Sequence, residues 1–364
     1  MNIRDALDPA PLMTVTPSTE SSLFIRACRR QPVERTPVWF MRQAGRYMPE
    51  YRALRAKHSL IELCTHPELA AEVTLQPLQR LEVDAAIIFA DLLLPPMAMG
   101  MSLKFVEGEG PVLSEPIRSE AALHQLHDPA AGELNYVGEA IRIVCRELNG
   151  RLPVIGFCGA PFTVASYMIE GGATRDFLTT KRLIYSQPAL WRALLDRLVR
   201  VQIAFLRSQV EAGVAALQIF DSWIGALSPA DYIEYALPHT KQLISAASSL
   251  GVPVIHFGTG TSGMLELLRE AGGDVIGADW RIDLGEAWRR IGHDRAVQGN
   301  LDPVLLYAPQ PVLRAAVERI MRAANQRPGH IFNLGHGILP TTPVENVQAV
   351  VEWVREFSTQ TPRE

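Results

Sequence analysis

Four arginines fall within fourteen residues near the beginning of the chain: Arg42, Arg46, Arg52 and Arg55. Guanidinium groups this close repel one another unless anions balance their charge, and Glu50 can balance only one of them. Gly45 lies inside the cluster and permits a close approach of the backbone. One interpretation is a solvated or ion-paired face of a helix that starts near Pro49. We favour the other interpretation, a clamp for a ligand that carries several negative charges.

Asp91 and His336 are the other side chains whose surroundings favour chemistry. Asp91 follows an apolar stretch, residues 85–89, and a carboxylate in such surroundings needs N–H donors or a cationic partner. Its alternative role is to cap the loop that follows. His336 stands between Gly335 and Gly337, so that no bulky neighbour in the sequence covers its ring. A single histidine is more often structural than catalytic, but this flanking favours a functional role.

The elements that must position these groups alternate between short apolar segments and longer amphipathic ones, from about residue 36 to the end. Most of the short segments are continuously apolar and rich in β-forming residues, which is typical of parallel strands buried on both faces. The predicted strands are Pro37–Met41, Asp84–Phe89, Pro153–Phe157, Val214–Phe220, Val252–Phe257, Asp274–Ala278, Ala296–Gln298 and Ile331–Leu334. The predicted helices include Pro67–Leu81, Leu134–Leu148, Ala189–Ala212, Pro229–Leu250 and Pro311–Ala324.

Eight strands, most of them followed by a helix, predict an α/β fold with a single (β/α)8 TIM barrel, and 364 residues suit it. A doubly wound sheet would show the same alternation, so the number of strands decides between the two. Because no linker or change of composition divides the chain, we expect one catalytic domain over residues 21–364, after a flexible leader over residues 1–20. Ser102–Leu113 is predicted to be a small inserted hairpin, since the sequence Gly-Glu-Gly-Pro breaks it into two arms.

In a barrel of this kind, functional groups gather where the strands end and the loops begin. Polar and glycine residues follow all the predicted strands, and a shared site explains eight such ends better than eight unrelated helix caps do. In chain order, these residues are Arg42–Tyr47, Asp91, Gly159–Pro161 with Tyr167 beyond them, Asp221–Ser222, Gly258–Gly260, Asp279, Gly299–Asn300 and Gly335–Gly337.

The composition excludes several classes of protein. A net charge of −4 argues against a basic protein that binds nucleic acid, and no window approaches the ~20 apolar residues of a membrane span. The beginning of the chain lacks the apolar core of a signal peptide. The four cysteines are too widely spaced to indicate a disulfide framework or a structural zinc site. We therefore expect a cytoplasmic protein with reduced thiols.

Two further features bear on cofactors. Only four of the 35 basic residues are lysines, and none of them ends a predicted strand, which disfavours Schiff-base chemistry and pyridoxal phosphate. The excess of arginine has an alternative explanation in genomic base composition.

Gly258–Gly263 has the spacing GxGxxG after a predicted strand, which is typical of dinucleotide binding. Since only about a hundred residues follow it, nucleotide binding without chemistry is an alternative that we do not favour.

Five long motifs resemble those of the uroporphyrinogen decarboxylase family, in the same order. They are PVWFMRQAGRYMPEYR (Pro37–Arg52), DAAIIFADLLLPPMAMGM (Asp84–Met101), GFCGAPFTVASYMIEGG (Gly156–Gly172), LQIFDSW (Leu217–Trp223) and FNLGHGILP (Phe332–Pro340). The resemblance covers the chain from about Ser21, and motifs of this length are specific. The alternative is another branch of the superfamily, the zinc-dependent corrinoid methyltransferases. That branch carries a His-x-Cys pair, and the corresponding His256-Phe257-Gly258 lacks the cysteine.

The resemblance implies a single (β/α)8 barrel that forms a homodimer and uses no cofactor and no metal. It implies the removal of CO2 from the four acetate arms of uroporphyrinogen III, a tetrapyrrole with eight carboxylates, to give coproporphyrinogen III in haem biosynthesis. The catalytic candidates are then Asp91, Arg42, Arg46 and His336. The residues that the resemblance places against the substrate are Arg42, Gln43, Ala44, Gly45, Arg46, Arg55, Asp91, Tyr167, Phe220, Ser222 and His336.

Such a reaction needs an acceptor for the electron pair of the departing carboxylate. A pyrrole ring protonated at an α-carbon is itself that acceptor, so the protein must stabilise a cation and hold anions. Asp91 suits the first task, because its carboxylate can accept the pyrrole N–H groups. Arg42, Arg46 and Arg55 suit the second, and one of them or His336 is a candidate proton donor.

Overall fold

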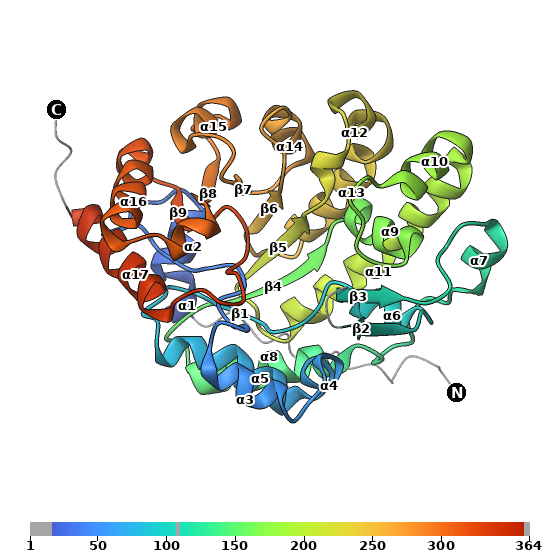
Figure 1. The fold of residues 1–364 in the computed structure, drawn as a ribbon, viewed down its shortest axis with the longest axis horizontal. Coiled ribbons are helices and arrows are strands. Elements are labelled where there is room, and N and C mark those ends of the chain that lie inside the picture. Colours follow the sequence, from blue (N-terminus) through green and yellow to red (C-terminus); the bar gives the residue numbers. More distant parts are fainter. Residues whose placement is uncertain (1–16, 107–109, 360–364) are drawn as a thin grey trace, which may run out of the picture.

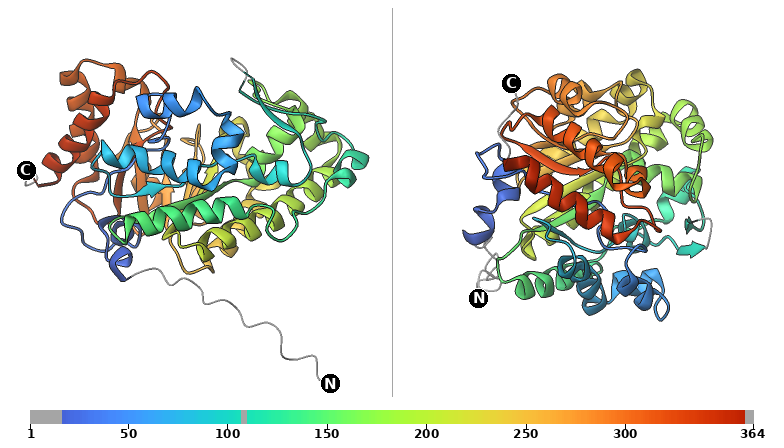
Figure 2. Two further views of the ribbon diagram at one scale, coloured as in Figure 1. Left: turned by 90° about the horizontal axis from the view of Figure 1, so that it is seen from below. Right: turned by 60° about the vertical axis from the view of Figure 1, so that its left-hand side comes forward.

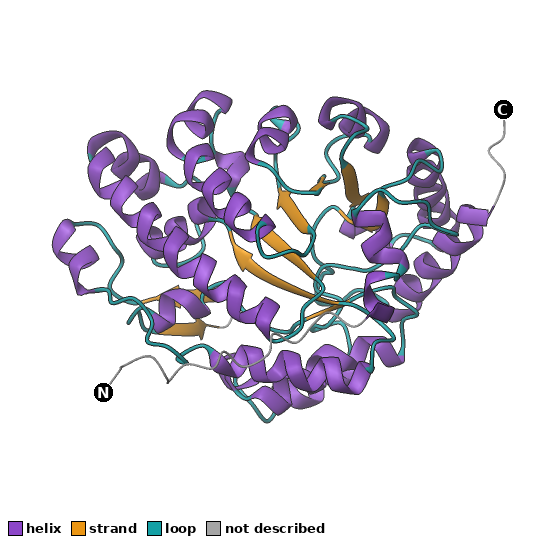
Figure 3. Ribbon diagram, turned by 180° about the vertical axis from the view of Figure 1, so that it is seen from behind, coloured by secondary structure: helices purple, strands orange, loops and turns teal. Residues whose placement is uncertain are grey.

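The computed structural model of the chain describes residues 17–106 and 110–359. Parallel strands form a curled sheet in the order β1-β4-β5-β6-β7-β8-β9, with helices outside it (Figure 1, Figure 3). Nearly every strand residue is buried, which explains why these segments are continuously apolar in the sequence. The strands are β1 (Ala86–Ile87), β4 (Val154–Gly159), β5 (Ala216–Asp221), β6 (Val254–Gly258), β7 (Val275–Gly277), β8 (Ala296–Leu301) and β9 (His330–Leu334).

Residues 37–41, which we name the closing segment, lie between β9 and β1 and close the sheet into a barrel. Val38 forms a parallel bridge with Phe332 of β9, whose N–H donates to the carbonyl of Pro37 at 2.9 Å. On the other side, the N–H of Asp84 donates to the carbonyl of Val38 at 2.8 Å. The predicted (β/α)8 barrel is therefore confirmed.

The closing segment pairs over fewer residues than the strand predicted for Pro37–Met41. Pro37 has no N–H to donate to a neighbouring strand. The N–H of Val38 donates to the side chain of Asp84, at 2.8 Å, instead of to a backbone carbonyl. On the side of β1, the segment is therefore held by one backbone hydrogen bond and one bond to a buried carboxylate, both involving Asp84.

Side chains fill the interior of the barrel and connect strands that are not neighbours. The indole N–H of Trp39 in the closing segment donates to Oε1 of Gln298 at 3.0 Å. Nε2 of Gln298 in turn donates to Oε1 of Gln218 at 3.1 Å. All three side chains are buried, so these hydrogen bonds fix the closing segment against β8 and β5.

Helices surround the barrel, and each helix of the outer ring packs against the next (Figure 2). In ring order they are α5 (Pro67–Leu75), α8 (Asn135–Leu148), α11 (Pro188–Glu211), α13 (Leu237–Ser248), α14 (Leu265–Ala271), α15 (Leu284–Ile291), α16 (Gln310–Ala324) and α17 (Val344–Thr359). Of the described residues, no helix combines the length and the apolar character that a membrane span requires. The four cysteines are free thiols, as predicted.

The loops carry shorter elements. Strands β2 (Leu103–Val106) and β3 (Gly110–Leu113) pair antiparallel and confirm the predicted inserted hairpin, whose tip lies outside the described residues. The shorter helices are α1 (Pro17–Glu20), α2 (Leu23–Cys28), α3 (Pro49–Arg55), α4 (Leu60–Thr65), α6 (Leu94–Ala98), α7 (Glu120–Gln125), α9 (Pro161–Glu170), α10 (Leu178–Ser186) and α12 (Pro229–Tyr235). Three 3₁₀ turns are η1 (Gln76–Gln79), η2 (Ile224–Ala226) and η3 (Pro303–Tyr307).

Proline explains two departures from the predicted helices. The helix predicted for Pro229–Leu250 is divided at Ala236 into α12 and α13, because Pro238 has no N–H to donate to the carbonyl one turn earlier and lies in the first turn of α13, where none is needed. The helix predicted for Pro67–Leu81 ends at Leu75, and Pro77 lies in the 3₁₀ turn that follows. The predicted leader lies mostly outside the described residues, apart from α1, and the division at residue 20 stays a prediction.

We predict that Asp84→Ala destabilises the barrel, because Asp84 joins the closing segment to β1. Arg35 donates two hydrogen bonds to its carboxylate, at 2.7 and 2.6 Å, and Val38 donates a third. Removing one partner of a largely buried ion pair costs about 3–5 kcal/mol of unfolding free energy, which urea denaturation measures.

Glu82→Ala is the matched control. Glu82 lies two residues before Asp84 in the sequence and pairs with Arg355, but its side chain is 77% exposed. An exposed pair contributes little, so we expect almost no change in stability. Equal losses in the two variants would contradict the role given to Asp84.

Candidate active site

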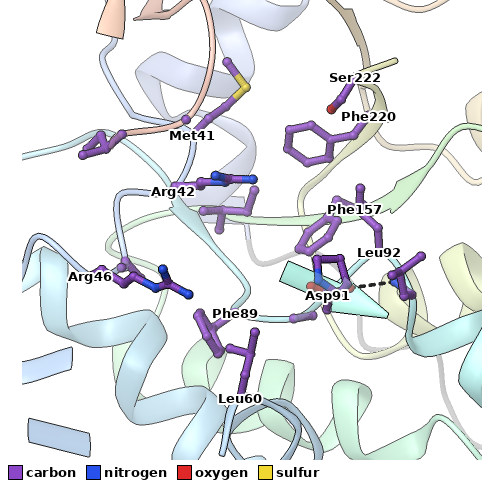
Figure 4. Close-up of a pocket in the computed structure, with 18 of the residues that line it drawn as sticks. Met41, Arg42, Arg46, Leu60, Phe89, Asp91, Leu92, Phe157, Phe220 and Ser222 are labelled. Atoms are coloured by element: carbon purple, nitrogen blue, oxygen red, sulfur yellow. Dashed lines mark hydrogen bonds between the residues drawn. The ribbon is translucent and has the colours of Figure 1, made fainter. Parts of the chain in front are cut away.

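A pocket of about 410 Å³ opens at the end of the barrel where the strands finish (Figure 4). Ten of the eleven residues predicted to contact a substrate line it: Arg42, Ala44, Gly45, Arg46, Arg55, Asp91, Tyr167, Phe220, Ser222 and His336. They come from the turn after the closing segment, from α3 and α9, and from the ends of β1, β5 and β9. The barrel therefore brings together residues that lie up to 294 positions apart in the chain, from Arg42 to His336.

Gln43 is the exception, because its side chain is buried and does not line the pocket. Its Oε1 accepts the N–H of Phe40 at 3.1 Å, and its Nε2 donates to the carbonyl of Ala85 at 3.1 Å. The first bond holds the turn against the closing segment, and the second joins it to the residue before β1. Gln43 supports the pocket wall from behind, and its amide is already occupied in these bonds.

The three pocket arginines have no carboxylate partner within 4 Å among the described residues. Figure 4 shows Arg42 and Arg46 extending into the pocket from one side, toward Asp91 and the aromatic wall. Arg55 donates to the carbonyl of His58, which leaves its charge unbalanced. Three guanidinium groups without carboxylate partners therefore give this end of the barrel a positive charge that would attract anions.

Arg52, the fourth arginine of the cluster, has a structural role. It does not line the pocket, and its guanidinium donates to the carbonyls of Arg46 and Tyr47, each at 2.9 Å. Glu50 forms its salt bridge with Arg80, from the turn after α5, and the charge of Arg52 acts on it more weakly. The cluster is therefore more strongly positive than its sequence indicated.

Asp91 is a partly accessible carboxylate at the bottom of the pocket. Its Oδ1 accepts the N–H of Leu93 at 2.9 Å, so it caps the following turn as well as facing the pocket. Burial raises the pKa of this carboxyl above its usual range, and the Leu93 N–H and the charge of Arg42 offset part of the rise. The protein alone therefore compensates a negative charge at Asp91 poorly, and a cation placed against it would stabilise that charge.

His336 also lines the pocket and is partly accessible. Burial lowers the pKa of its imidazole to about 4 together with the positive charges of Arg42 and Arg281, while the charge of Asp279 opposes the shift. Its Nδ1 accepts the N–H of Gly337 at 2.6 Å, so the proton of the neutral ring is on Nε2. At neutral pH, His336 therefore offers an uncharged N–H donor to a ligand.

An aromatic wall faces the arginines. Phe220 contacts Phe157 and Phe257 edge to face, with ring centroids 5.5 and 6.1 Å apart. Tyr167 stacks on Trp223 at 3.7 Å between centroids. This wall gives the pocket an apolar face for a flat ring system beside its cationic rim.

Phe157 and Phe257 were missed in the sequence analysis, which considered mainly polar residues. Their position one or two residues before the end of a buried strand was the available signal, since Phe220 of β5 pairs directly with Phe257 of β6. The inserted hairpin also reaches the pocket through Phe105 and Pro111. No local pattern in the sequence indicated that contribution.

A family model described as Uroporphyrinogen decarboxylase (URO-D) matches residues 19–357. The chain belongs to the uroporphyrinogen decarboxylase family. A uroporphyrinogen decarboxylase of Solibacter usitatus is 58% identical over 345 residues, which cover 95% of this chain and 99% of that relative. One of Koribacter versatilis is 55% identical over 347 residues, which cover 94% of this chain and 99% of the relative.

Proteins with other names share the fold of this chain. A solved methyltransferase from Methanosarcina mazei has a TM-score of 0.78, covers 92% of this chain and 99% of its own, and is 21% identical. That likeness shows the fold alone. His256, which corresponds to the histidine of the methyltransferase pair, is buried with its Nδ1 3.4 Å from the carbonyl of Leu268, and it does not line the pocket. The methyltransferase alternative is therefore not favoured.

Other strand-end residues of this family member hold loops together. Asp279 is buried and accepts the N–H of Gly260 and a bond from Arg281, both at 2.6 Å. Asn300 donates to the carbonyls of Asp279 and Ile282 at 2.8 and 2.7 Å. The expectation of one site shared by eight strand ends is thus correct for only some of them.

The glycines of Gly258–Gly263 also have a packing role. A Cβ atom at Gly225 in η2 would lie 2.4 Å from the carbonyl oxygen of Thr259 and 2.7 Å from Cα of Gly260. The two loops therefore pack backbone to backbone, which requires glycine on both sides. This packing accounts for the central glycine of the GxGxxG spacing without a nucleotide.

We predict that Arg42→Ala raises the pKa of His336 toward its ordinary value. The positive charge of Arg42 disfavours the imidazolium, so its removal favours protonation, although burial still holds the pKa below the usual range. NMR titration of the histidine ring measures the change. Arg52→Ala is the control from the same cluster, and a His336 pKa that responds equally to both substitutions would contradict the electrostatic role of Arg42.

Proposed function

We propose that this chain removes CO2 from the four acetate arms of uroporphyrinogen III and releases coproporphyrinogen III. One observation carries the proposal: a partly buried carboxylate and three arginines without carboxylate partners share one pocket with an aromatic wall. Relatives that are 55–58% identical over nearly the whole chain are named uroporphyrinogen decarboxylase, which is a carboxy-lyase. A ligand with several carboxylates and a ring that becomes cationic would pair with the arginines and the carboxylate together.

The chemistry divides between the substrate and the protein. Protonation at the α-carbon of a pyrrole makes the ring cationic. The bond between the acetate methylene and its carboxylate then breaks, and its electron pair moves into the ring as CO2 leaves. The exocyclic methylene that results takes up a proton to become a methyl group, and loss of the ring proton restores the pyrrole. We propose that the reaction needs no cofactor, since the substrate supplies the electron sink.

Asp91 is the group that we place against the cationic ring. Its carboxylate lies at the bottom of the pocket, where it can accept the inward-pointing N–H groups of the tetrapyrrole. A charge-assisted hydrogen bond contributes about 1.5–3 kcal/mol. Since burial raises the pKa of this carboxyl, the ring cation and the carboxylate stabilise each other as the charge develops.

The remaining side chains hold the carboxylate arms and the ring faces. Arg42, Arg46 and Arg55 are positioned to pair with acetates and propionates. Tyr167 and Ser222, together with Nε2–H of His336, are neutral donors to the same arms. The neutral state of His336 makes it a hydrogen-bond donor in the free protein, and we do not assign it the reacting proton.

We further propose that two copies of the chain associate and that the protein acts in the cytoplasm. The homodimer is what the family resemblance implies. Leu178 and Ile233, whose side chains are 64% and 50% exposed on α10 and α12, are apolar surface that a second copy could cover. Sedimentation velocity would then give twice the mass of the 40.2 kDa chain, and a monomer at micromolar concentration would contradict it.

The experiment that tests the proposed function is anaerobic incubation of the purified protein with uroporphyrinogen III, with carboxyl groups of the oxidised products counted by mass spectrometry. We expect wild type to remove four carboxyls. We expect Asp91→Ala to lose about 10²–10³-fold in kcat, because the ring cation loses its counter-charge.

Asp91→Asn separates this role from the capping of the turn. An asparagine oxygen can still accept the N–H of Leu93, so the turn is kept while the charge is removed. We expect an unchanged urea midpoint and a loss of kcat close to that of Asp91→Ala. Wild-type turnover in Asp91→Asn would reduce Asp91 to a cap.

For the arginines, we predict that Arg46→Ala and Arg55→Ala each lose about 2–5 kcal/mol of transition-state stabilisation, since each leaves a substrate carboxylate unpaired. Values of kcat/KM for uroporphyrinogen III measure the effect. Arg52→Ala is the control, because Arg52 belongs to the same cluster but does not line the pocket. Equal kinetics in the three variants would indicate a surface cluster without a role in binding.

A further inference from the structure

The side chain of Arg42 runs directly across Gly337. A Cβ atom at position 337 would lie 2.4 Å from Cδ of Arg42, 2.6 Å from Cγ and 3.0 Å from Nε. Carbon atoms that are not bonded do not approach this closely, so any side chain at position 337 would force Arg42 to move. The three atoms nearest to that Cβ all belong to Arg42.

The backbone of Gly337 does not itself require glycine. Its φ lies outside the left-handed region, so alanine can adopt the same conformation. Gly335, two residues earlier, is different, because a Cβ there would lie 2.3 Å from the backbone nitrogen of Trp280. Gly335 is therefore needed for the packing of two loops, whereas Gly337 is needed for the space that Arg42 occupies.

The backbone of Arg42 is held in place, so a clash at position 337 must move its side chain. Arg42 has a φ of 59°, a left-handed conformation that a residue with a long side chain adopts only where its surroundings impose it. The N–H of Ile338 donates to the carbonyl of Met41 at 2.9 Å, and the N–H of Met41 donates to Asn333 at 3.0 Å. The clash falls on Cγ and Cδ, near the start of the side chain. A rotation that removes the clash therefore also moves the guanidinium group out of its present position in the pocket.

The charge of Arg42 acts on the other titratable groups of the pocket. It lowers the pKa of His336, and it offsets part of the rise that burial causes in the pKa of Asp91 and of Tyr167. Displacement of this one guanidinium therefore changes the electrostatics of the whole pocket.

We propose that Gly337 is a positioning residue. Because it has no side chain, the side chain of Arg42 can pass over it and place its guanidinium group in the pocket that Asp91 also lines. In the proposed function, which this inference deepens, that position lets Arg42 pair with a substrate carboxylate. The requirement for glycine in the Gly-His-Gly sequence after β9 then comes from an arginine almost 300 residues earlier in the chain.

The test is a double-mutant cycle of Gly337→Ala and Arg42→Ala. We expect Gly337→Ala to lower kcat/KM for uroporphyrinogen III about 10²-fold, as displacement of a binding group does. In the Arg42→Ala background, the same substitution should cause no further loss, because the side chain that it displaces is absent. Full additivity would overturn the proposal, since the methyl group would then act on the substrate or the fold directly.

Gly263→Ala is the matched control, because a Cβ atom there meets nothing within 4 Å and the residue lies in another loop at the same end of the barrel. It should leave kcat/KM unchanged. If Gly337→Ala alone does not fold, the double variant should, since removal of Arg42 makes room for the methyl group. Failure of both variants to fold would also overturn the proposal.

The pKa of His336, followed by NMR titration, is a readout that does not depend on the reaction. Gly337→Ala should shift it from the wild-type value, and should shift it no further in the Arg42→Ala background. This result would stand even if the protein did not decarboxylate uroporphyrinogen III. An unchanged pKa in Gly337→Ala would show that Arg42 has not moved and would contradict the inference.

Discussion

The closure of the barrel between residues 37–41 and β1 is the constraint on which the rest of this structure depends. Arg42 follows the closing segment, and Asp91 follows β1, so the two neighbours deliver a cation and a carboxylate to the same end of the barrel. The contact depends on Asp84, which accepts the N–H of Val38 and two bonds from Arg35. The hydrogen bonds to the Asp84 carboxylate thus supplement the short backbone pairing between the closing segment and β1, whereas other strands of the sheet pair over more residues.

The pocket that results is electrostatically incomplete. Its arginines have no carboxylate partners among the described residues, and the one carboxylate at its bottom lies in surroundings that raise its pKa. Both imbalances are removed by a ligand that carries anions at its periphery and develops positive charge at its centre. A tetrapyrrole with carboxylate arms and a ring that is protonated during the reaction has this distribution. In the function that we propose, the protein is preorganised for the charges of the transition state.

The sequence predicted the parts of the structure that are encoded locally. Continuously apolar segments indicated buried parallel strands, and the residues after them indicated the site. Gln43 was assigned to the substrate because it belongs to a motif, yet its amide is used to join two backbone segments. A motif shows that a residue is required, but not whether it faces the ligand or the fold. The split of the helix predicted for Pro229–Leu250 has a local cause that could have been recognised at Pro238.

Other features could not have been predicted, since they depend on residues far apart in the chain. The partner of Glu50 is Arg80, not a member of the arginine cluster, and this pairing is set by the approach of α3 to the turn after α5. The steric contact between Gly337 and Arg42 exists only because β9 and the closing segment are neighbours in the barrel. Net charge was similarly uninformative, because −4 over the whole chain coexists with a strongly cationic pocket.

The measurement that tests the central claim most directly is a crystal structure of the wild-type protein with coproporphyrinogen III, grown without oxygen. The account predicts that the pyrrole N–H groups of the bound product lie within hydrogen-bond distance of the Asp91 carboxylate. It also predicts that the propionates of the product pair with Arg42, Arg46 or Arg55. A tetrapyrrole bound outside this pocket, or bound with its N–H groups away from Asp91, would contradict it.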